Sequence, residues 1–101
     1  EVTALQSGMK SGDHCLAMLW SPELMGPEFK SKVADMRNSV ADRMNASSAA
    51  AAYFVWSHID DLELRWLHID LAGPAFIDNR ATGYGAALMR EIVLALAAPA
   101  A

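Results

Sequence analysis

The stretch from Arg65 to Pro74 constrains the fold of this chain more than any other feature. Its side chains alternate between two bulky faces, with Leu67, Ile69 and Leu71 on one and Trp66, His68 and Asp70 on the other. A strand that is bulky on both faces is typical of the centre of a covered sheet. Gly73 and Pro74 end the strand, and the loop that leaves the carboxyl end of a parallel strand is where ligands bind. The stretch therefore predicts a buried strand that runs into a ligand-binding loop.

The apolar content is high for so short a chain. Of the 101 residues 53% are hydrophobic, and the mean hydropathy is +0.15. A small domain has a high surface-to-volume ratio and should expose more polar residues. We therefore expect other subunits, or the rest of a longer polypeptide, to cover some of these faces. The chain begins without Met in a helix-like segment, Glu1 to Lys10, that has no capping signal before it, which favours a longer polypeptide.

The charge and the cysteine content exclude several classes of protein. The net charge is -4 and the basic residues form no cluster, so a nucleic-acid-binding protein is excluded. Cys15 is the only cysteine, which rules out an internal disulfide framework and fits a reducing compartment. No segment reaches the roughly 18 uninterrupted apolar residues of a membrane span. We expect a soluble protein that binds neither nucleic acid nor membrane.

The hydrophobic periodicity predicts alternating strands and helices. The predicted elements are a helix in Glu1–Lys10, a strand in Lys32–Met36, a buried helix from Asn45 to Ile59, the strand Arg65–Leu71, a loop in Ile77–Thr82 and a helix in Tyr84–Leu96. From Lys32 onward this order makes a βαβα unit, which implies parallel strands and a right-handed crossover. Two strands do not form a stable sheet alone. The sequence therefore predicts an α/β fold whose sheet is incomplete.

Two short clusters contain potential metal ligands. The segment Gly12 to Cys15 places an Asp, a His and a Cys side by side, but adjacent side chains point in different directions, so a turn after the first helix is the favoured interpretation. His58 lies with Asp60 and Asp61 at a helix end, where a His is explained by the helix dipole. Both clusters are therefore interpreted as structural.

The predicted central strand offers a third candidate. His68 and Asp70 lie on one strand face, an arrangement in which a carboxylate orients an imidazole. The alternative is that His68 is a core residue bonded to the backbone, while Asp70 lies nearer the ligand end of the strand. The segment Gly83-Tyr84-Gly85 lacks the Lys of known phosphate loops, so close packing of the helix start is favoured there.

Five segments, in this order and with this spacing, resemble the leucine aminopeptidase family, also called cytosol aminopeptidases. They are Ser11-Gly12-Asp13, Leu19-Trp20, Val33-Ala34-Asp35-Met36-Arg37-Asn38, Trp66-Leu67-His68-Ile69-Asp70-Leu71-Ala72-Gly73 and Ala81-Thr82-Gly83-Tyr84-Gly85. The resemblance covers essentially the whole chain and places residues 1–101 in the C-terminal part of the catalytic domain. The segment from Asn38 to Arg43 is similar to the divergent aminopeptidase-like branch of the family.

The resemblance implies a fold, an activity and partners for the complete protein. The fold would be the βαβα portion of a mixed, mostly parallel sheet with helices on both faces, part of a zinc-exopeptidase-type domain. The activity would be removal of N-terminal residues from peptides, with a preference for bulky apolar residues such as leucine. Two divalent metal ions, zinc or manganese, would activate a water and polarise the scissile carbonyl. The protein would be a cytoplasmic homohexamer.

The resemblance also assigns residues of this chain. The metal ligands and the catalytic arginine of the family lie upstream, and Asp13, Asp35 and Asp70 match none of them, so no metal or catalytic residue is expected here. Ala72 and Ala75 match positions in the wall of the substrate side-chain pocket. Ser39 matches a third such position, where relatives often carry an apolar residue, so the substrate preference stays open.

Two alternatives to the enzyme remain. One is a homologue without metals that acts as a structural or assembly subunit, and the other is a free-standing interaction module. If the complete protein is the enzyme, this stretch alone should be inert.

Overall fold

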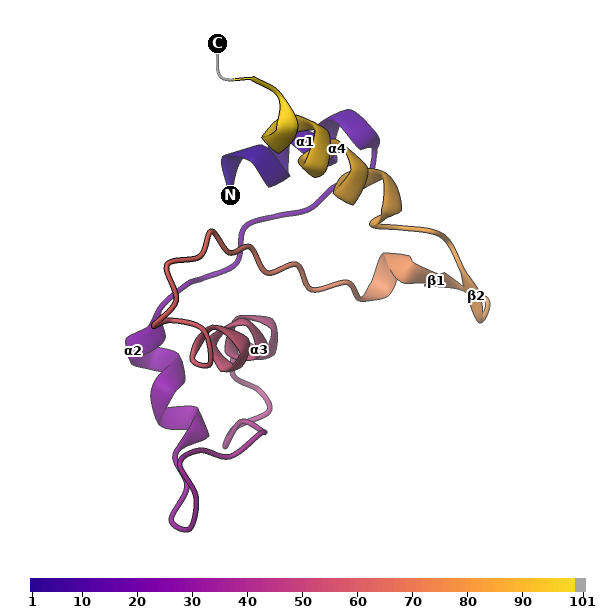
Figure 1. Cartoon of the computed structure of the whole chain (residues 1–101). Coiled ribbons are helices and arrows are strands. Elements are labelled where there is room, and N and C mark those ends of the chain that lie inside the picture. The colour runs from indigo at the N-terminus through magenta and orange to yellow at the C-terminus, as the bar shows by residue number, and fades with distance from the viewer. Residues whose placement is uncertain (100–101) are drawn as a thin grey trace. The chain divides into compact units, whose positions relative to one another are not determined.

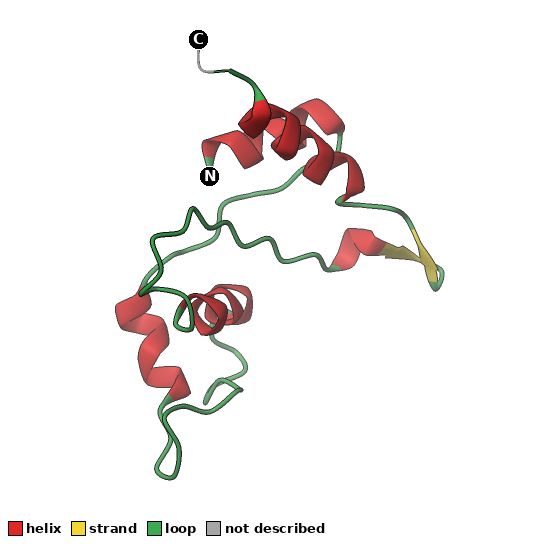
Figure 2. Ribbon diagram, in the orientation of Figure 1, coloured by secondary structure: helices red, strands yellow, loops and turns green. Residues whose placement is uncertain are grey.

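The computed structural model describes residues 1–99, which form helices and one small sheet (Figure 1, Figure 2). The elements in chain order are α1 (Val2–Ser11), α2 (Pro22–Met25), the 3-10 helix η1 (Gly26–Phe29), α3 (Ser47–Trp56), the 3-10 helix η2 (Gly73–Ala75), β1 (Phe76–Ile77), β2 (Arg80–Ala81) and α4 (Ala86–Ala97). They form two compact units, the first made of residues 1–17 and 69–99 and the second of residues 18–68.

The first unit is built on α1 and α4, which lie side by side (Figure 1). Leu88 is fully buried, and Ile92 packs with it against Ala4 of α1. Leu88 and Ile92 share one face of α4 because they are four residues apart. Cys15 and Ile69 are partly buried against this cluster.

The ends of α1 and α4 follow from glycines in the left-handed region. Gly12 has φ 85° and its N–H donates to the Gly8 carbonyl, which ends α1. Gly85 has φ 95° and precedes the first residue of α4. Both predicted terminal helices are confirmed, with bounds that differ by one or two residues.

A hairpin lies where the sequence predicts a polar loop. β1 and β2 pair antiparallel, with Phe76 opposite Ala81 and Ile77 opposite Arg80. The two residues between the strands, Asp78 and Asn79, have φ of 47° and 63°. Two-residue hairpin turns of this kind favour Asn and Asp because these residues tolerate a positive φ. The Asp-Asn pair was therefore the signal that could have predicted the hairpin.

The second unit packs α2 and η1 against α3. Met25 and Phe29 are buried against Ala49 and Ala50 of α3, and the Phe29 ring stacks on Tyr53 with centroids 5.6 Å apart. The predicted helix from Asn45 to Ile59 is confirmed in its central part, which is α3. Within this chain α3 buries its small alanine face, while bulky Val55 remains 43% exposed.

The short helices α2 and η1 were not predicted. Ser21 stands at the N-cap of α2 and Pro22 is its first residue, which is a known start signal. Met25 and Phe29, spaced by four, supply the buried side chains.

The structure forms neither of the two predicted strands. Near Lys32–Met36 the Ser31 hydroxyl accepts hydrogen bonds from Val33 N and Ala34 N, at 3.2 and 3.1 Å, and this bend satisfies the backbone locally. Residues 63–72 form neither helix nor strand. A strand needs a neighbour to accept its hydrogen bonds, and within residues 1–99 only β1 and β2 pair. The parallel βαβα pairing is therefore not formed within residues 1–99.

Candidate functional site

The candidate pocket wall is a turn of small residues. It begins at Ala72 and continues through η2, where Ala75 N donates to the Ala72 carbonyl at 3.0 Å. Ala72 is exposed and Ala75 is half-buried. Side chains of this size leave room for a ligand side chain beside the backbone.

The turn is hydrogen-bonded to the segment that follows β2. Thr82 Oγ1 donates to the Pro74 carbonyl at 2.6 Å, and Thr82 N donates to the Ala75 carbonyl at 3.0 Å. The same hydroxyl accepts from Tyr84 N at 3.1 Å. Thr82 therefore closes the base of the hairpin and holds the last two carbonyls of the turn.

The start of α4 packs against the residue just before the turn. A Cβ placed on Gly85 would lie 3.0 Å from Leu71 Cδ1, so only glycine fits there without a shift. Asp13 Oδ2 accepts from Gly85 N at 3.0 Å and from Leu88 N at 3.2 Å. A carboxylate in this position caps the helix and interacts favourably with its dipole. The predicted close packing of the helix start is confirmed at Gly85, whereas a Cβ on Gly83 would meet nothing within 4 Å.

Ser39 belongs to the second unit, so only Ala72 and Ala75 of the three predicted pocket residues share a unit. Ser39 is exposed in the loop that precedes α3. Glu28 organises this loop by accepting from Asp42 N at 2.9 Å and from Asn45 Nδ2 at 3.1 Å. These two hydrogen bonds lower the pKa of Glu28, and the one from Asp42 has the larger effect. Sequence reasoning did not identify Glu28.

The other sequence candidates have structural partners. In the turn after α1, Asp13 caps α4, and the His14 carbonyl accepts a hydrogen bond from the Tyr84 hydroxyl. Cys15 Sγ lies 3.6 Å from the Ala4 carbonyl. The predicted structural turn at Gly12–Cys15 is therefore confirmed.

The histidines beyond α3 also have neighbours. His58 Nδ1 lies 2.6 Å from the Phe54 carbonyl and therefore donates to it. His68 is half-buried beside Trp66, with ring centroids 5.8 Å apart, and Asp70 is exposed. Because residues 63–72 are not in a strand, the predicted shared face of His68 and Asp70 is not present here.

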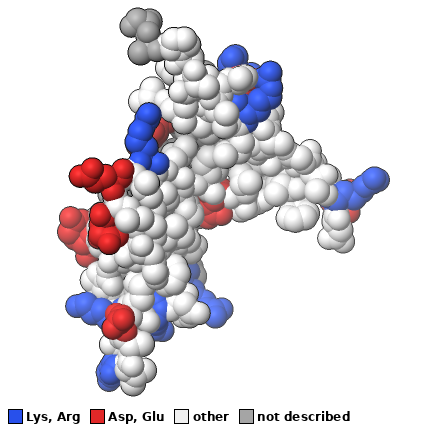
Figure 3. Space-filling model, in the orientation of Figure 1, with Lys and Arg blue, Asp and Glu red and all other residues white. Residues whose placement is uncertain are grey.

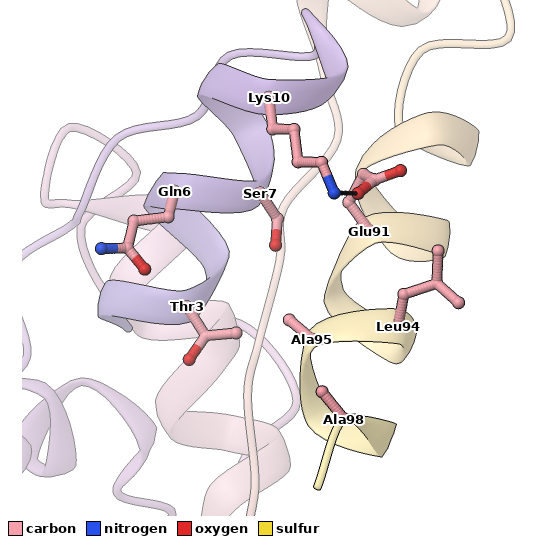
Figure 4. Close-up of a pocket in the computed structure, with 8 residues that line it drawn as sticks. All are labelled: Thr3, Gln6, Ser7, Lys10, Glu91, Leu94, Ala95 and Ala98. Carbon is pink, nitrogen blue, oxygen red and sulfur yellow. Dashed lines mark ion pairs between the residues drawn. The ribbon is translucent and has the colours of Figure 1, made fainter. Parts of the chain in front are cut away.

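A cavity of about 340 Å³ opens between α1 and α4 (Figure 4). An ion pair crosses it, with Lys10 Nζ 2.6 Å from Glu91 Oε2. Arg90 contacts the other oxygen of Glu91. The hydrogen bond from Lys10, supported by both positive charges, lowers the pKa of Glu91 against the opposing effect of burial.

This ion pair predicts a loss of stability in acid. Since the folded state lowers the pKa of Glu91, its contribution is present above the unfolded value of 4.5 and is lost as the pH falls through the folded value. In the complete protein, Glu91→Gln should reduce the thermal midpoint at neutral pH and have a progressively smaller effect as the pH falls below 4.5. Glu63→Gln, at an exposed position, is the control. A Glu91→Gln effect that does not shrink in acid would contradict the prediction.

The charged side chains gather in small groups of both signs on the face shown in Figure 3, separated by uncharged atoms. Among residues 1–99, none of the helices has the length and apolar character of a membrane span.

Comparison with known proteins decides the family. Residues 2–90 match the catalytic domain of the cytosol aminopeptidase family. The chain belongs to the cytosol aminopeptidase family. It is 46% identical over 90 residues to the human probable aminopeptidase NPEPL1 (Homo sapiens), covering 88% of this chain and 17% of that protein. It is 43% identical over 91 residues to leucine aminopeptidase 1 of Caenorhabditis elegans, covering 88% and 18%. The predicted family and its aminopeptidase-like branch are confirmed.

Solved structures of family members resemble the chain as well. The apo leucyl aminopeptidase from Trypanosoma cruzi superposes with a TM-score of 0.84 at 43% identity, covering 91% of this chain and 18% of that one. The C. elegans leucine aminopeptidase LAP1 gives a TM-score of 0.82 at 38% identity, covering 93% and 20%. The chain thus spans about a fifth of the length of these relatives.

A two-metal centre needs a cluster of ligand side chains. In the part of the chain that the structure describes, no three His, Cys, Asp or Glu side chains lie close enough together to hold a metal ion. Two carboxylates of the first unit, Asp13 and Glu91, already have partners in the helix cap and the ion pair. These residues do not fit the metal centre implied by the resemblance.

Proposed function

We propose that this chain is the C-terminal part of the catalytic domain of a leucyl-type aminopeptidase. The complete protein hydrolyses N-terminal residues from peptides, and residues 1–101 supply core packing and one wall of the substrate side-chain pocket. The family match over residues 2–90 supports the activity. The turn at Ala72–Ala75 supports the pocket wall, because it presents small side chains on a hydrogen-bonded frame.

The exposed apolar side chains support a larger domain. Within this chain Val33 is 96% exposed, Leu16 75% and Phe76 67%. Water-exposed apolar surface of this extent is typical of faces that another structure covers. We propose that residues 32–36 and 65–71 become strands when they pair with the rest of the catalytic domain. The complete sheet would be mixed and mostly parallel, with helices on both of its faces.

The remaining properties of the proposed enzyme are those of its family. The complete protein binds two divalent metal ions, zinc or manganese, through residues outside this chain, and it is a cytoplasmic homohexamer. The carboxylates of this chain serve packing and capping instead, as Asp13 does at α4.

The pocket assignment predicts a change in substrate preference. In the complete protein, Ala72→Phe should lower kcat/KM for a leucyl amide about 10- to 100-fold, because the added ring takes the space of the substrate side chain. An alanyl amide should lose much less. Both values are measured by steady-state kinetics on the same preparation.

Ala97→Phe is the matched control, since Ala97 is exposed at the end of α4 and outside the matched residues 2–90. Equal losses for the two substrates would remove Ala72 from the pocket wall. A wild-type complete protein that folds, binds no metal and cleaves neither substrate would instead favour the metal-free structural or assembly subunit.

A further inference from the structure

Thr82 ties the turn at Ala72–Ala75 to the start of α4. We propose that Thr82 is a positioning residue of the substrate pocket, which sets the place of the small-residue wall without touching substrate. The proposal rests on the proposed function, because it assigns a role within that same pocket.

Both polar groups of Thr82 act on the turn. Its hydroxyl donates to the Pro74 carbonyl at 2.6 Å, and its backbone N–H donates to the Ala75 carbonyl at 3.0 Å. A hydroxyl has one proton and two lone pairs, so it also accepts from Tyr84 N at 3.1 Å. The side chain therefore bridges the turn and the residues that lead into α4.

Little else in the described part of the chain holds the turn in place. Ala72 is exposed, and a Cβ on Gly73 would meet open space, so packing holds the middle of the turn less firmly than its flanks, where Leu71 contacts Gly85 and Ala75 is half-buried. Pro74 has no N–H and cannot add a backbone hydrogen bond of its own. The hydrogen bonds from Thr82 are consequently the main restraint on the carbonyls of Pro74 and Ala75.

The other end of the bridge is anchored. The Tyr84 hydroxyl donates to the His14 carbonyl, and Gly85 N donates to Asp13 Oδ2 at 3.0 Å. Both partners lie just after α1, which packs on α4. Thr82 thus fixes the pocket wall relative to the packed helices α1 and α4. Displacement of reacting or binding groups by about 1 Å is enough to change turnover strongly.

The test removes the hydroxyl and follows substrate preference in the complete protein. Thr82→Val keeps the β-branched shape but cannot donate to Pro74. We expect the ratio of kcat/KM for leucyl over alanyl amides to fall about tenfold, mainly through KM for the leucyl substrate. Thr82→Ser retains the hydroxyl and should stay within about twofold of wild type.

Thr3→Val is the matched control, because Thr3 is the other threonine and lines the cavity between α1 and α4. An unchanged leucyl-to-alanyl ratio in an active Thr82→Val variant overturns the proposal while leaving the proposed function intact. A wild-type protein with no aminopeptidase activity overturns the proposed function itself. If Thr82→Val does not fold, the ratio is measured in Thr82→Ala, and misfolding of both variants makes Thr82 structural and overturns the positioning role.

Discussion

Prepared alone, the 101-residue chain should hydrolyse leucyl amides no faster than buffer does, whereas the complete protein should cleave them. Enzymes accelerate such reactions by about 10⁶-fold or more, so the rates of the complete protein and the isolated chain should differ by this whole factor. The reason lies in the donor set, since residues 1–99 contain no cluster of His, Cys, Asp and Glu that could hold a metal ion. The isolated chain should also show no tight zinc binding.

Two measurements on matched samples check this expectation. Hydrolysis of a leucyl amide is followed for the isolated chain and the complete protein at equal concentration, and zinc binding is followed by calorimetry. A folded isolated chain that turns over substrate, or binds zinc tightly at neutral pH, would show that the catalytic groups are present here after all. Inactivity of the complete protein would contradict the proposed function rather than the division of roles within it.

The three longer helices, α1, α3 and α4, were predictable because their signals are local. The four-residue spacing of Leu88 and Ile92 places α4, and Gly12 marks the end of α1. The two strands predicted in Lys32–Met36 and Arg65–Leu71 are not formed here, because a parallel strand depends on partners distant in sequence. The alternation in Arg65–Leu71 describes two faces to be covered, and the structure of these residues alone contains no neighbouring strand for it. Local polar groups then decide the outcome, as the Ser31 hydroxyl does at Val33.

The candidate site divides in the same way. Ala72 and Ala75 were identified through the family resemblance, and their small size is visible in the sequence. The residues that support them were not identified, because the hairpin brings Thr82 to the turn and the packing of α1 on α4 brings Asp13 to the start of α4. Asp13 was considered as a metal ligand, and its capping role requires a contact with Leu88 across 75 residues of sequence. Such long-range hydrogen bonds leave no periodic signal.

Leu88→Ala should produce the largest loss of stability among substitutions in the first unit. Leu88 is 0% exposed and packs with Ala4 and Ile92. Truncation of a buried leucine costs about 2–5 kcal/mol, the higher values applying where the surroundings do not collapse into the cavity. The buried face of α1 consists of Ala4, Ser7 and Gly8, whose small side chains cannot fill the space.

Thermal unfolding of the complete protein measures this loss, with Met89→Ala as the control. Met89 is the next residue of α4 and is 50% exposed in this chain, so its truncation should lower the midpoint much less. The Leu88→Ala protein should retain its leucyl-to-alanyl preference below its midpoint, because the substitution leaves the hydrogen bonds of Thr82 and Asp13 in place.

If the two variants unfold at the same temperature, the packing of α4 on α1 does not limit the stability of the protein. Leu88→Ala could instead change the substrate preference at low temperature. That result would show that the core as well as the cap sets the position of α4, and that the space left by Leu88 shifts the pocket wall through the contact of Gly85 with Leu71.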